Sequence, residues 1–247
     1  MTDARTAELA ANLRAVRERI EIACEASGRP PATLIVVTKF FAAEDVYRLV
    51  DLGVTDVGEN RDQEARAKHE QCVDLPLTWH FIGQIQTNKA KSVVRYADLV
   101  HTVDRSSLAT ALNKAAATVD RVLDVLVQVN LDPDPREGRG GCPPSAVPDL
   151  VAHIHAADHL RVRGVMGVAP LGDAPDPAFA RLSALADDVR AASPEADIIS
   201  AGMSSDLEAA VSHGATHLRI GTAVMGSRPT VRYRPIKGGK HNEGDAQ

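Results

Sequence analysis

Hydrophobic and polar residues alternate along the chain in two patterns, one typical of buried strands and one typical of amphipathic helices. Residues 34–39 read Leu-Ile-Val-Val-Thr-Lys, in which the first five residues are apolar or β-branched. A run of this length predicts a strand that is buried on both faces, as in a parallel sheet. Residues 6–26 instead place apolar side chains every three or four positions, with Arg and Glu between them. This spacing predicts an amphipathic helix.

The same two patterns then alternate through most of the chain. We predict strands at residues 34–39, 54–57, 79–83, 99–103, 123–129, 162–166, 197–200 and 216–220. We predict helices at residues 43–52, 61–70, 84–96, 106–119, 145–155, 178–192 and 207–213. About eight strand and helix units without a change of composition favour an α/β fold, a single (β/α)8 barrel of the TIM type with an extra N-terminal helix. The alternative is a doubly wound open sheet, which is disfavoured because no GxGxxG follows an early strand.

Two segments do not follow this alternation. We expect residues 1–231 to form the single domain and residues 232–247, which are polar and glycine-containing, to form a disordered tail. Residues 131–144 are rich in Pro, Gly and charge. That composition predicts a long exposed loop.

Composition narrows the classes of function. The net charge is −5 and the sequence pI is about 6.0, so no basic excess indicates nucleic-acid binding. Cys24, Cys72 and Cys142 show no CxxC spacing, and the N-terminus lacks an apolar signal core. We therefore expect a protein of the reducing cytoplasm, without disulfides. No apolar run approaches the roughly 20 residues that cross a bilayer, and metabolite chemistry is the favoured class.

Polar residues at the ends of the predicted strands are the candidates for chemistry, because a (β/α)8 barrel carries its active site at the C-terminal ends of its strands. Lys39 is the first of them. An unpaired ammonium in a low-dielectric site tends to lose its proton, and the neutral amine is a nucleophile towards aldehydes. The strand-end candidates are Lys39, Asn60, His80, His101, Asn130, Met166, Ser204, Arg219 and Thr222.

The loops after the last two predicted strands suit a phosphate group. Barrels often bind phosphate with these loops and a helix N-terminus, and small residues let backbone N–H groups reach the anion. Gly202 and Gly221 are such residues, and Ser204, Ser205 and Thr222 add hydroxyl donors. A phosphate here and a lysine on the first strand together suggest pyridoxal 5'-phosphate held as a Schiff base on Lys39. Taken alone, a lysine at the end of a strand is more often an ordinary surface residue, and a Gly-Met-Ser helix start is more often an ordinary helix cap.

Two other polar groups have simpler interpretations. His155 and His159 are one helical turn apart, but no acidic or cysteine partner has metal spacing, so we predict no metal site. Lys89, Lys91 and Arg95 share one helix face. Such a face is usually solvated, and a docking surface for acidic partners is the alternative.

Five motifs follow one another in a characteristic order. They are Thr38-Lys39, Gly58-Glu59-Asn60, Trp79-His80-Phe81-Ile82-Gly83 with Asn88-Lys89, Gly202-Met203-Ser204 with Asp206, and Arg219-Ile220-Gly221-Thr222-Ala223. From about Leu34 to Gly226 the chain resembles the pyridoxal phosphate homeostasis proteins, which are single-domain relatives of the barrel domain of alanine racemase. This resemblance implies a barrel fold and pyridoxal phosphate as the cofactor.

The resemblance also implies roles for the matching residues. Lys39 matches the Schiff-base lysine, Asn60 matches an asparagine that lines the ring, and Arg219 matches the arginine that faces the pyridine nitrogen. Because an arginine keeps its charge, it opposes protonation of that nitrogen and weakens the ring as an electron sink. Ser204, Gly221 and Thr222 match the phosphate cradle. The full set of cofactor-binding candidates is Lys39, Asn60, His80, Met166, Ser204, Ser205, Arg219, Gly221 and Thr222.

Two classes of function remain. The first is a non-catalytic protein that holds pyridoxal phosphate and acts in its homeostasis and supply to apo-enzymes. The second is a pyridoxal-phosphate-dependent amino-acid racemase, which needs acid–base groups on both faces of the cofactor. Lys39 supplies one, but Tyr47, Tyr96 and Tyr233 are poorly placed for the other, and the second domain that brings a tyrosine in alanine racemase is not expected here. We favour a cytoplasmic, monomeric carrier without nucleic-acid or membrane partners.

Overall fold

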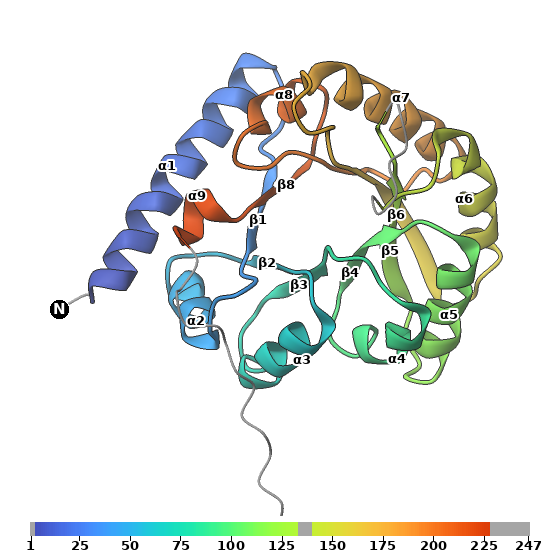
Figure 1. Cartoon of the computed structure of the whole chain (residues 1–247), viewed down its shortest axis with the longest axis horizontal. Helices are drawn as coiled ribbons and strands as arrows, with labels where there is room; N and C mark the ends of the chain where they lie inside the picture. The colour runs from blue at the N-terminus through green and yellow to red at the C-terminus, as the bar shows by residue number, and fades with distance from the viewer. Residues whose placement is uncertain (1–2, 133–139, 228–247) are drawn as a thin grey trace, which may run out of the picture.

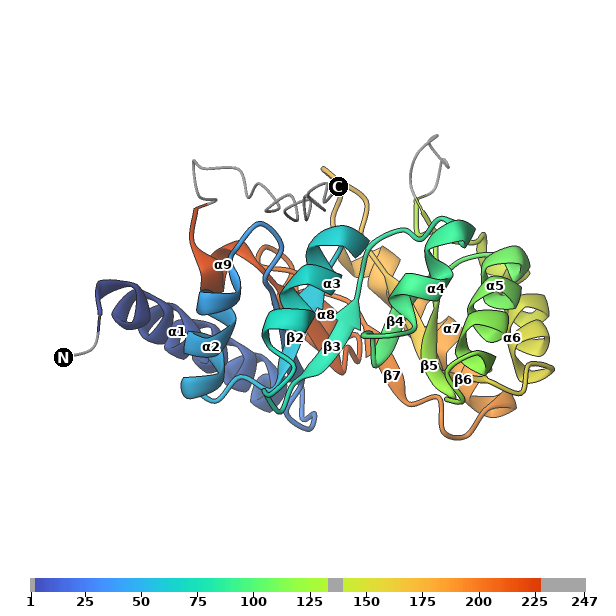
Figure 2. The ribbon, with the colours of Figure 1, turned by 90° about the horizontal axis from the view of Figure 1, so that it is seen from below.

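The computed structural model describes residues 3–132 and 140–227. Its eight parallel strands close into a barrel in chain order, and helices surround the strands (Figure 1). β1 completes the barrel by pairing with β8, with Ile35 opposite Arg219. Figure 2 shows the same barrel from the side, with α3, α4 and α5 outside the strands. The predicted (β/α)8 barrel with an N-terminal helix is confirmed.

The elements alternate through the described residues. The strands are β1 (Thr33–Val37), β2 (Asp56–Glu59), β3 (Thr78–Phe81), β4 (Leu99–Val103), β5 (Leu123–Val129), β6 (Leu160–Gly167), β7 (Ile198–Ser200) and β8 (His217–Ile220). The α-helices are α1 (Ala4–Ala26), α2 (Ala43–Asp51), α3 (Asp62–Gln71), α4 (Ala90–Val93), α5 (Ser106–Ala117), α6 (Val147–His155), α7 (Asp176–Ala192), α8 (Leu207–Ser212) and α9 (Thr222–Met225). Two 3-10 turns are η1 (Thr87–Lys89) and η2 (Pro144–Ala146).

The helix predicted at residues 84–96 and the strand predicted at residues 54–57 were wrong in extent. The helix predicted at residues 84–96 is only η1 followed by the single-turn α4, because Thr, Asn, Ser and Val are weak helix formers. In addition, Arg105 binds the carbonyl of Ile85 at 2.8 Å. The second strand begins at Asp56, since the N–H of Val54 bonds to Leu49 and closes the end of α2. The tail predicted at 232–247 and the centre of the loop predicted at 131–144 lie outside the described residues.

The helix α1 packs against the outside of the barrel, beside α8 and α9 (Figure 1). The Asp3 carboxylate caps it by accepting from the N–H of Thr6 at 2.8 Å, and its apolar face is buried. Its polar side chains reach two loops of the barrel. Asn12 donates to the carbonyl of Val224 at 3.0 Å, and Arg19 donates to the carbonyl of Ser204 at 3.2 Å. α1 therefore holds the loops that follow β7 and β8.

The interior of the barrel has an apolar side and a polar side. Alternate residues of a strand point to the same face, and the inward residues of β4 to β7 include an apolar cluster of Leu99, Leu126, Met166 and Ile198. Towards β2, β3 and β8 the interior side chains are polar instead. They include Asp56, His80, His101, Ser200, His217 and Arg219. A polar interior of this kind is unusual for a packed barrel core and is available for chemistry.

His217 makes the stability of the barrel depend on pH. Burial, and then the neighbouring His80, lower its pKa to about 4, whereas a histidine in the unfolded chain has a pKa of about 6.5. Between these values the unfolded chain binds more protons, so stability falls as the pH drops. The His217 contribution between pH 7 and pH 5 is about 2 kcal/mol. When the pH drops from 7 to 5, the free energy of unfolding in urea should fall by about 2 kcal/mol less in His217→Asn than in wild type. An equal fall in both proteins would contradict the assignment.

Candidate functional site

Lys39 lies at the C-terminal end of the barrel, on a turn that follows β1. The prediction that it ends a buried strand was wrong, because β1 stops at Val37 and Lys39 is half-buried in the turn. The N–H of Phe41 donates to the carbonyl of Thr38 at 3.1 Å and closes this turn. Phe40 has a φ of 73°, in the left-handed region that aromatic residues rarely adopt. Such a backbone persists only where its surroundings hold it.

Three charged side chains behind the turn hold it, and we call Glu59, Glu64 and Lys68 the anchoring cluster. The hydroxyl of Thr38 donates to the Glu59 carboxylate at 2.7 Å, and the Lys68 ammonium donates to the Thr38 carbonyl at 2.8 Å. Lys68 also forms an ion pair with Glu59. The N–H of Phe40 donates to the Glu64 carboxylate. The cluster thus fixes both neighbours of Lys39.

The anchoring cluster is buried, which makes its partners interdependent. Glu59 is 1% exposed and Lys68 is 4% exposed. Burial raises the pKa of Glu59, and the ammonium of Lys68 opposes that rise. A buried ion pair contributes little net stability, but removal of one partner leaves an uncompensated charge. The ion pair between Glu59 and Lys68 instead holds Thr38 in place. Sequence reasoning missed Lys68, although Glu64 and Lys68 have the i,i+4 spacing of an ion pair on one helix.

Arg219 carries a buried charge, and Asp206 is the carboxylate that acts on it, at a distance too long for an ion pair. Its guanidinium is 5% exposed and donates to the hydroxyl of Ser200 at 2.6 Å and to the carbonyl of Gly167 at 3.0 Å. No carboxylate in residues 3–132 or 140–227 forms an ion pair with it. Burial lowers its pKa to about 10, so the group stays charged at neutral pH. A buried cation without an ion pair suits a ligand with an acceptor or an anionic group.

Asn60 is a second residue with a buried polar group that suits a ligand. It follows β2, and its Oδ1 is buried without a hydrogen-bond partner in the part of the chain that the structure describes. An unsatisfied buried acceptor is costly unless a ligand supplies the donor. Val37 pairs with Gly58 between β1 and β2, and Lys39 and Asn60 each lie two residues beyond that pair. Both residues therefore lie next to each other along the chain ends of β1 and β2, at the barrel mouth.

The loops after β7 and β8 bring the predicted phosphate residues together. Gly202 has a φ of 90°, which favours glycine, and its carbonyl accepts from the N–H of Arg219 at 3.0 Å. The Asp206 carboxylate accepts from the N–H of Met203 at 2.6 Å and shapes the next turn. The candidate residues differ in accessibility: Ser204 and Gly221 are half-buried, and Ser205 and Thr222 are exposed.

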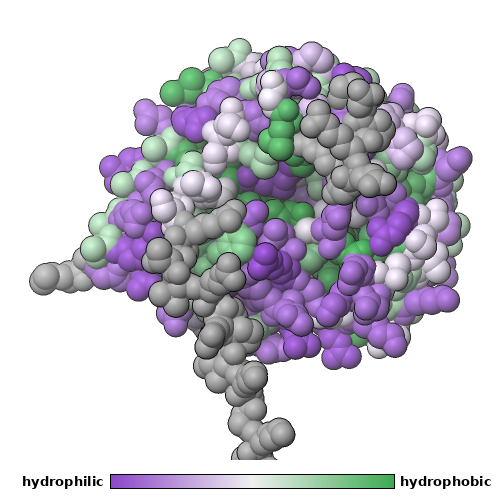
Figure 3. All heavy atoms as spheres, in the orientation of Figure 1, coloured by the Kyte–Doolittle hydropathy of each residue, from purple (hydrophilic) through white to green (hydrophobic). Residues whose placement is uncertain are grey.

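His80 and Met166 occupy deeper positions than the other candidates. Both ring nitrogens of His80 are engaged, one with His101 and one with Asp56, each at 2.9 Å. Met166 is 2% exposed and belongs to the apolar cluster inside the barrel. Lys39, Asn60, Arg219 and the two loops thus converge at the C-terminal end, and His80 lies further towards the start of β2. Figure 3 shows this end of the barrel hollowed at its centre.

The described residues show neither a metal-binding cluster nor a membrane-spanning helix. In residues 3–132 and 140–227, no group of three or more His, Cys, Asp and Glu side chains could hold a metal ion. Over the same ranges, no helix combines the length and the apolar character needed to cross a membrane.

Comparisons with known proteins show which family the chain resembles. The model of the family "Alanine racemase, N-terminal domain" matches residues 11–229. A pyridoxal phosphate homeostasis protein of Mycobacterium bovis is 42% identical over 243 residues, covering 91% of this chain and 94% of that protein. The structure of PipY from Synechococcus elongatus with PLP bound is 34% identical, with a TM-score of 0.76, and covers 88% of this chain and 100% of PipY.

Alanine racemase itself is similar only in fold. The enzyme of Corynebacterium glutamicum is 16% identical, with a TM-score of 0.68, and the match covers 89% of this chain and 60% of the racemase. The family model and the Mycobacterium bovis relative match the chain by sequence over most of its length, which is stronger evidence than a similar fold. The chain therefore belongs to the alanine racemase N-terminal domain family, among the pyridoxal phosphate homeostasis proteins.

Proposed function

We propose that the protein holds pyridoxal 5'-phosphate as a Schiff base on Lys39 and serves in the homeostasis and supply of this cofactor, without catalysing a reaction of its own. The observation that carries the proposal is the buried guanidinium of Arg219, which forms no ion pair within the described residues and lies at the same end of the barrel as Lys39. The PLP-bound structure of PipY, at 34% identity, supports it. In this proposal the protein is a cytoplasmic monomer, and pyridoxal-phosphate-dependent apo-enzymes are its partners.

The residues at the mouth match the functional groups of pyridoxal phosphate. The amine of Lys39 would bond to the aldehyde carbon with release of one water molecule. Asn60 has a buried oxygen that needs a donor, and Arg219 has N–H groups that suit an acceptor such as a pyridine nitrogen. Ser204, Ser205, Gly221 and Thr222 would hold the phosphate, and Met166 and His80 lie on the interior side of the mouth.

The charge of Arg219 favours binding of the cofactor without catalysis. When bound, pyridoxal phosphate supplies an electron sink whose strength depends on the protonation of its ring nitrogen. The Arg219 guanidinium is a donor only and is charged at neutral pH. It therefore opposes a proton on an adjacent nitrogen. A cofactor held in this way is reactive as an aldehyde but poor at stabilising a carbanion.

Neither tyrosine of the described residues is placed to supply the second acid–base group of the racemase alternative. Tyr47 is on α2, and its hydroxyl bonds to Gln71 and Asp74 at the surface. Tyr96 is buried outside the barrel, against Phe81, and its hydroxyl reaches Asp62 at 3.3 Å. Neither faces the mouth, and Tyr233 lies outside the described residues. The carrier is therefore the better-supported function.

Attachment of the cofactor to Lys39 is tested by absorbance. Purified protein mixed with pyridoxal phosphate should show an imine band that borohydride removes, because the reagent reduces the imine to a stable amine. Lys39→Ala should lose the band and keep its fold by circular dichroism. The matched control is Lys114→Ala, which removes an exposed lysine on α5 and should keep the band. An unchanged band in Lys39→Ala would exclude the proposed attachment.

The anchoring cluster is tested by pairing stability with cofactor binding. Lys68→Met should destabilise the protein by about 3–5 kcal/mol in urea unfolding, since it leaves Glu59 buried and charged. The double variant Glu59→Leu with Lys68→Met should recover much of that loss. It should still bind pyridoxal phosphate about tenfold more weakly, because Thr38 and the turn lose charged hydrogen bonds.

The control for this experiment lies on the same helix. Arg66 and Glu70 form an exposed i,i+4 pair at 3.8 Å, so Arg66→Met should cost less than about 1 kcal/mol and leave cofactor binding unchanged. Wild-type affinity in the double variant would show that the cluster does not position Lys39.

A further inference from the structure

A continuous chain of hydrogen bonds crosses the interior of the barrel from Arg219 to Asp56. The Arg219 guanidinium bonds to Ser200 Oγ at 2.6 Å, and Ser200 Oγ to His101 Nδ1 at 2.9 Å. His101 Nε2 lies 2.9 Å from His80 Nδ1, and His80 Nε2 lies 2.9 Å from Asp56 Oδ1. We call these five side chains, from β8, β7, β4, β3 and β2, the interior relay.

The acidic end of the interior relay fixes the direction of every bond when both histidines are neutral. An ionised Asp56 can only accept, so His80 donates to it from Nε2. The bare Nδ1 of His80 then accepts from His101 Nε2, and the bare Nδ1 of His101 accepts from the Ser200 hydroxyl. Ser200 Oγ also accepts from Arg219, which can only donate. In this arrangement each ring carries its proton on Nε2.

Burial supports this proton arrangement. His101 is 0% exposed, and its pKa lies well below the usual value because of burial, with His80 and Arg219 lowering it further. If the hydrogen bonds ran in the opposite direction, His80 would carry protons on both ring nitrogens, and His101 would carry its proton on Nδ1. This arrangement would place a second cation in the interior that already holds Arg219. Aligned hydrogen bonds polarise one another in a low-dielectric interior, so the neutral arrangement also strengthens each bond.

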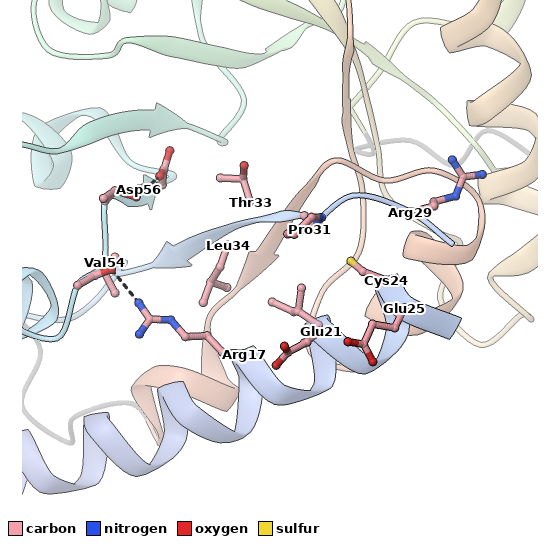
Figure 4. A pocket seen from close by; sticks show the side chains of 14 residues that line it. Arg17, Glu21, Cys24, Glu25, Arg29, Pro31, Thr33, Leu34, Val54 and Asp56 are labelled. Carbon is pink, nitrogen blue, oxygen red and sulfur yellow. Dashed lines mark hydrogen bonds between the residues drawn. The ribbon is translucent and has the colours of Figure 1, made fainter. Parts of the chain in front are cut away.

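Asp56 is the acidic end of the relay, at the start of β2. Burial acts to raise its pKa, but hydrogen bonds from His80 and Thr55 outweigh this and leave the pKa below its usual value. Asp56 also lines a cavity of about 640 Å³ between α1 and the beginnings of β1 and β2 (Figure 4). This cavity is at the opposite end of the barrel from Lys39. The relay thus joins the N-terminal end of the barrel to the guanidinium at its mouth.

We propose that the interior relay positions Arg219 for the cofactor, because it fixes the Ser200 hydroxyl that accepts from the guanidinium. Asp56, His80, His101 and Ser200 are then positioning residues, because they act on a bound molecule only through the guanidinium. The relay limits the rotation of Arg219. This inference rests on the proposed function, since it assigns the relay to the ring-binding side of the same site.

The proton arrangement is tested in the cofactor-free protein by 15N NMR of the histidine rings at pH 7.5. Wild type should show His80 and His101 neutral, each with its proton on Nε2. Ser200→Ala should shift the Nδ1 signal of His101, because the hydroxyl donor is gone. The control is His217→Asn: its ring centroid lies 6.2 Å from that of His80, but it is outside the relay. This variant should leave the arrangement unchanged. A proton on Nδ1 of either histidine in wild type would overturn the proposal.

The effect on Arg219 is tested by pyridoxal phosphate titration of the same variants. Ser200→Ala and Asp56→Asn should each bind about tenfold more weakly than wild type, since Arg219 loses a charged hydrogen bond in the first and the relay loses the acceptor that sets its direction in the second. His217→Asn should bind as wild type does. Unchanged affinity in both relay variants would overturn the positioning role. An absent imine band in wild type would contradict the proposed function, whereas the NMR result tests the relay without any cofactor.

Discussion

The guanidinium of Arg219, buried without a carboxylate beside it, determines the character of the barrel interior. A charge in a low-dielectric site is stable only where polar groups surround it. Here the Ser200 hydroxyl, the Gly167 carbonyl and the two histidines beyond them provide those groups. The interior is therefore polar on one side and apolar on the other, around Leu99, Leu126, Met166 and Ile198. Arg219 is the charged residue of the polar side that lies nearest the mouth.

The site is held from two directions. From outside the barrel, Glu59, Glu64 and Lys68 fix the turn that carries Lys39. From inside, the Ser200 hydroxyl and the Gly167 carbonyl accept from Arg219, and α1 holds the loops after β7 and β8. A rigid site of this kind suits tight binding of a small aldehyde. Combined with a cation that opposes ring protonation, it favours storage of the cofactor over chemistry on a substrate.

Much of the fold was predictable because buried parallel strands are continuous apolar runs. The limits of β4 and β5 were predicted to the residue, and the strand-end rule selected Lys39, Asn60 and Arg219. The end of β1 was not predictable, because Thr38 has the β-branched character of a strand residue and its turn depends on Lys68 from another helix. The contact between His80 and His101 joins residues 21 apart and exists only once β3 and β4 pair in the barrel. Periodicity carries no information about such contacts.

If attachment of the cofactor is itself the function, the bound cofactor should not promote hydrogen exchange at the α-carbon of amino acids. The cofactor-loaded protein would be incubated in deuterated water with single enantiomers of several amino acids, and the α-position followed by proton NMR. We expect no α-deuteration above the rate of free pyridoxal phosphate and no inversion. Steady α-deuteration with inversion, dependent on Lys39, would contradict this function and support a racemase.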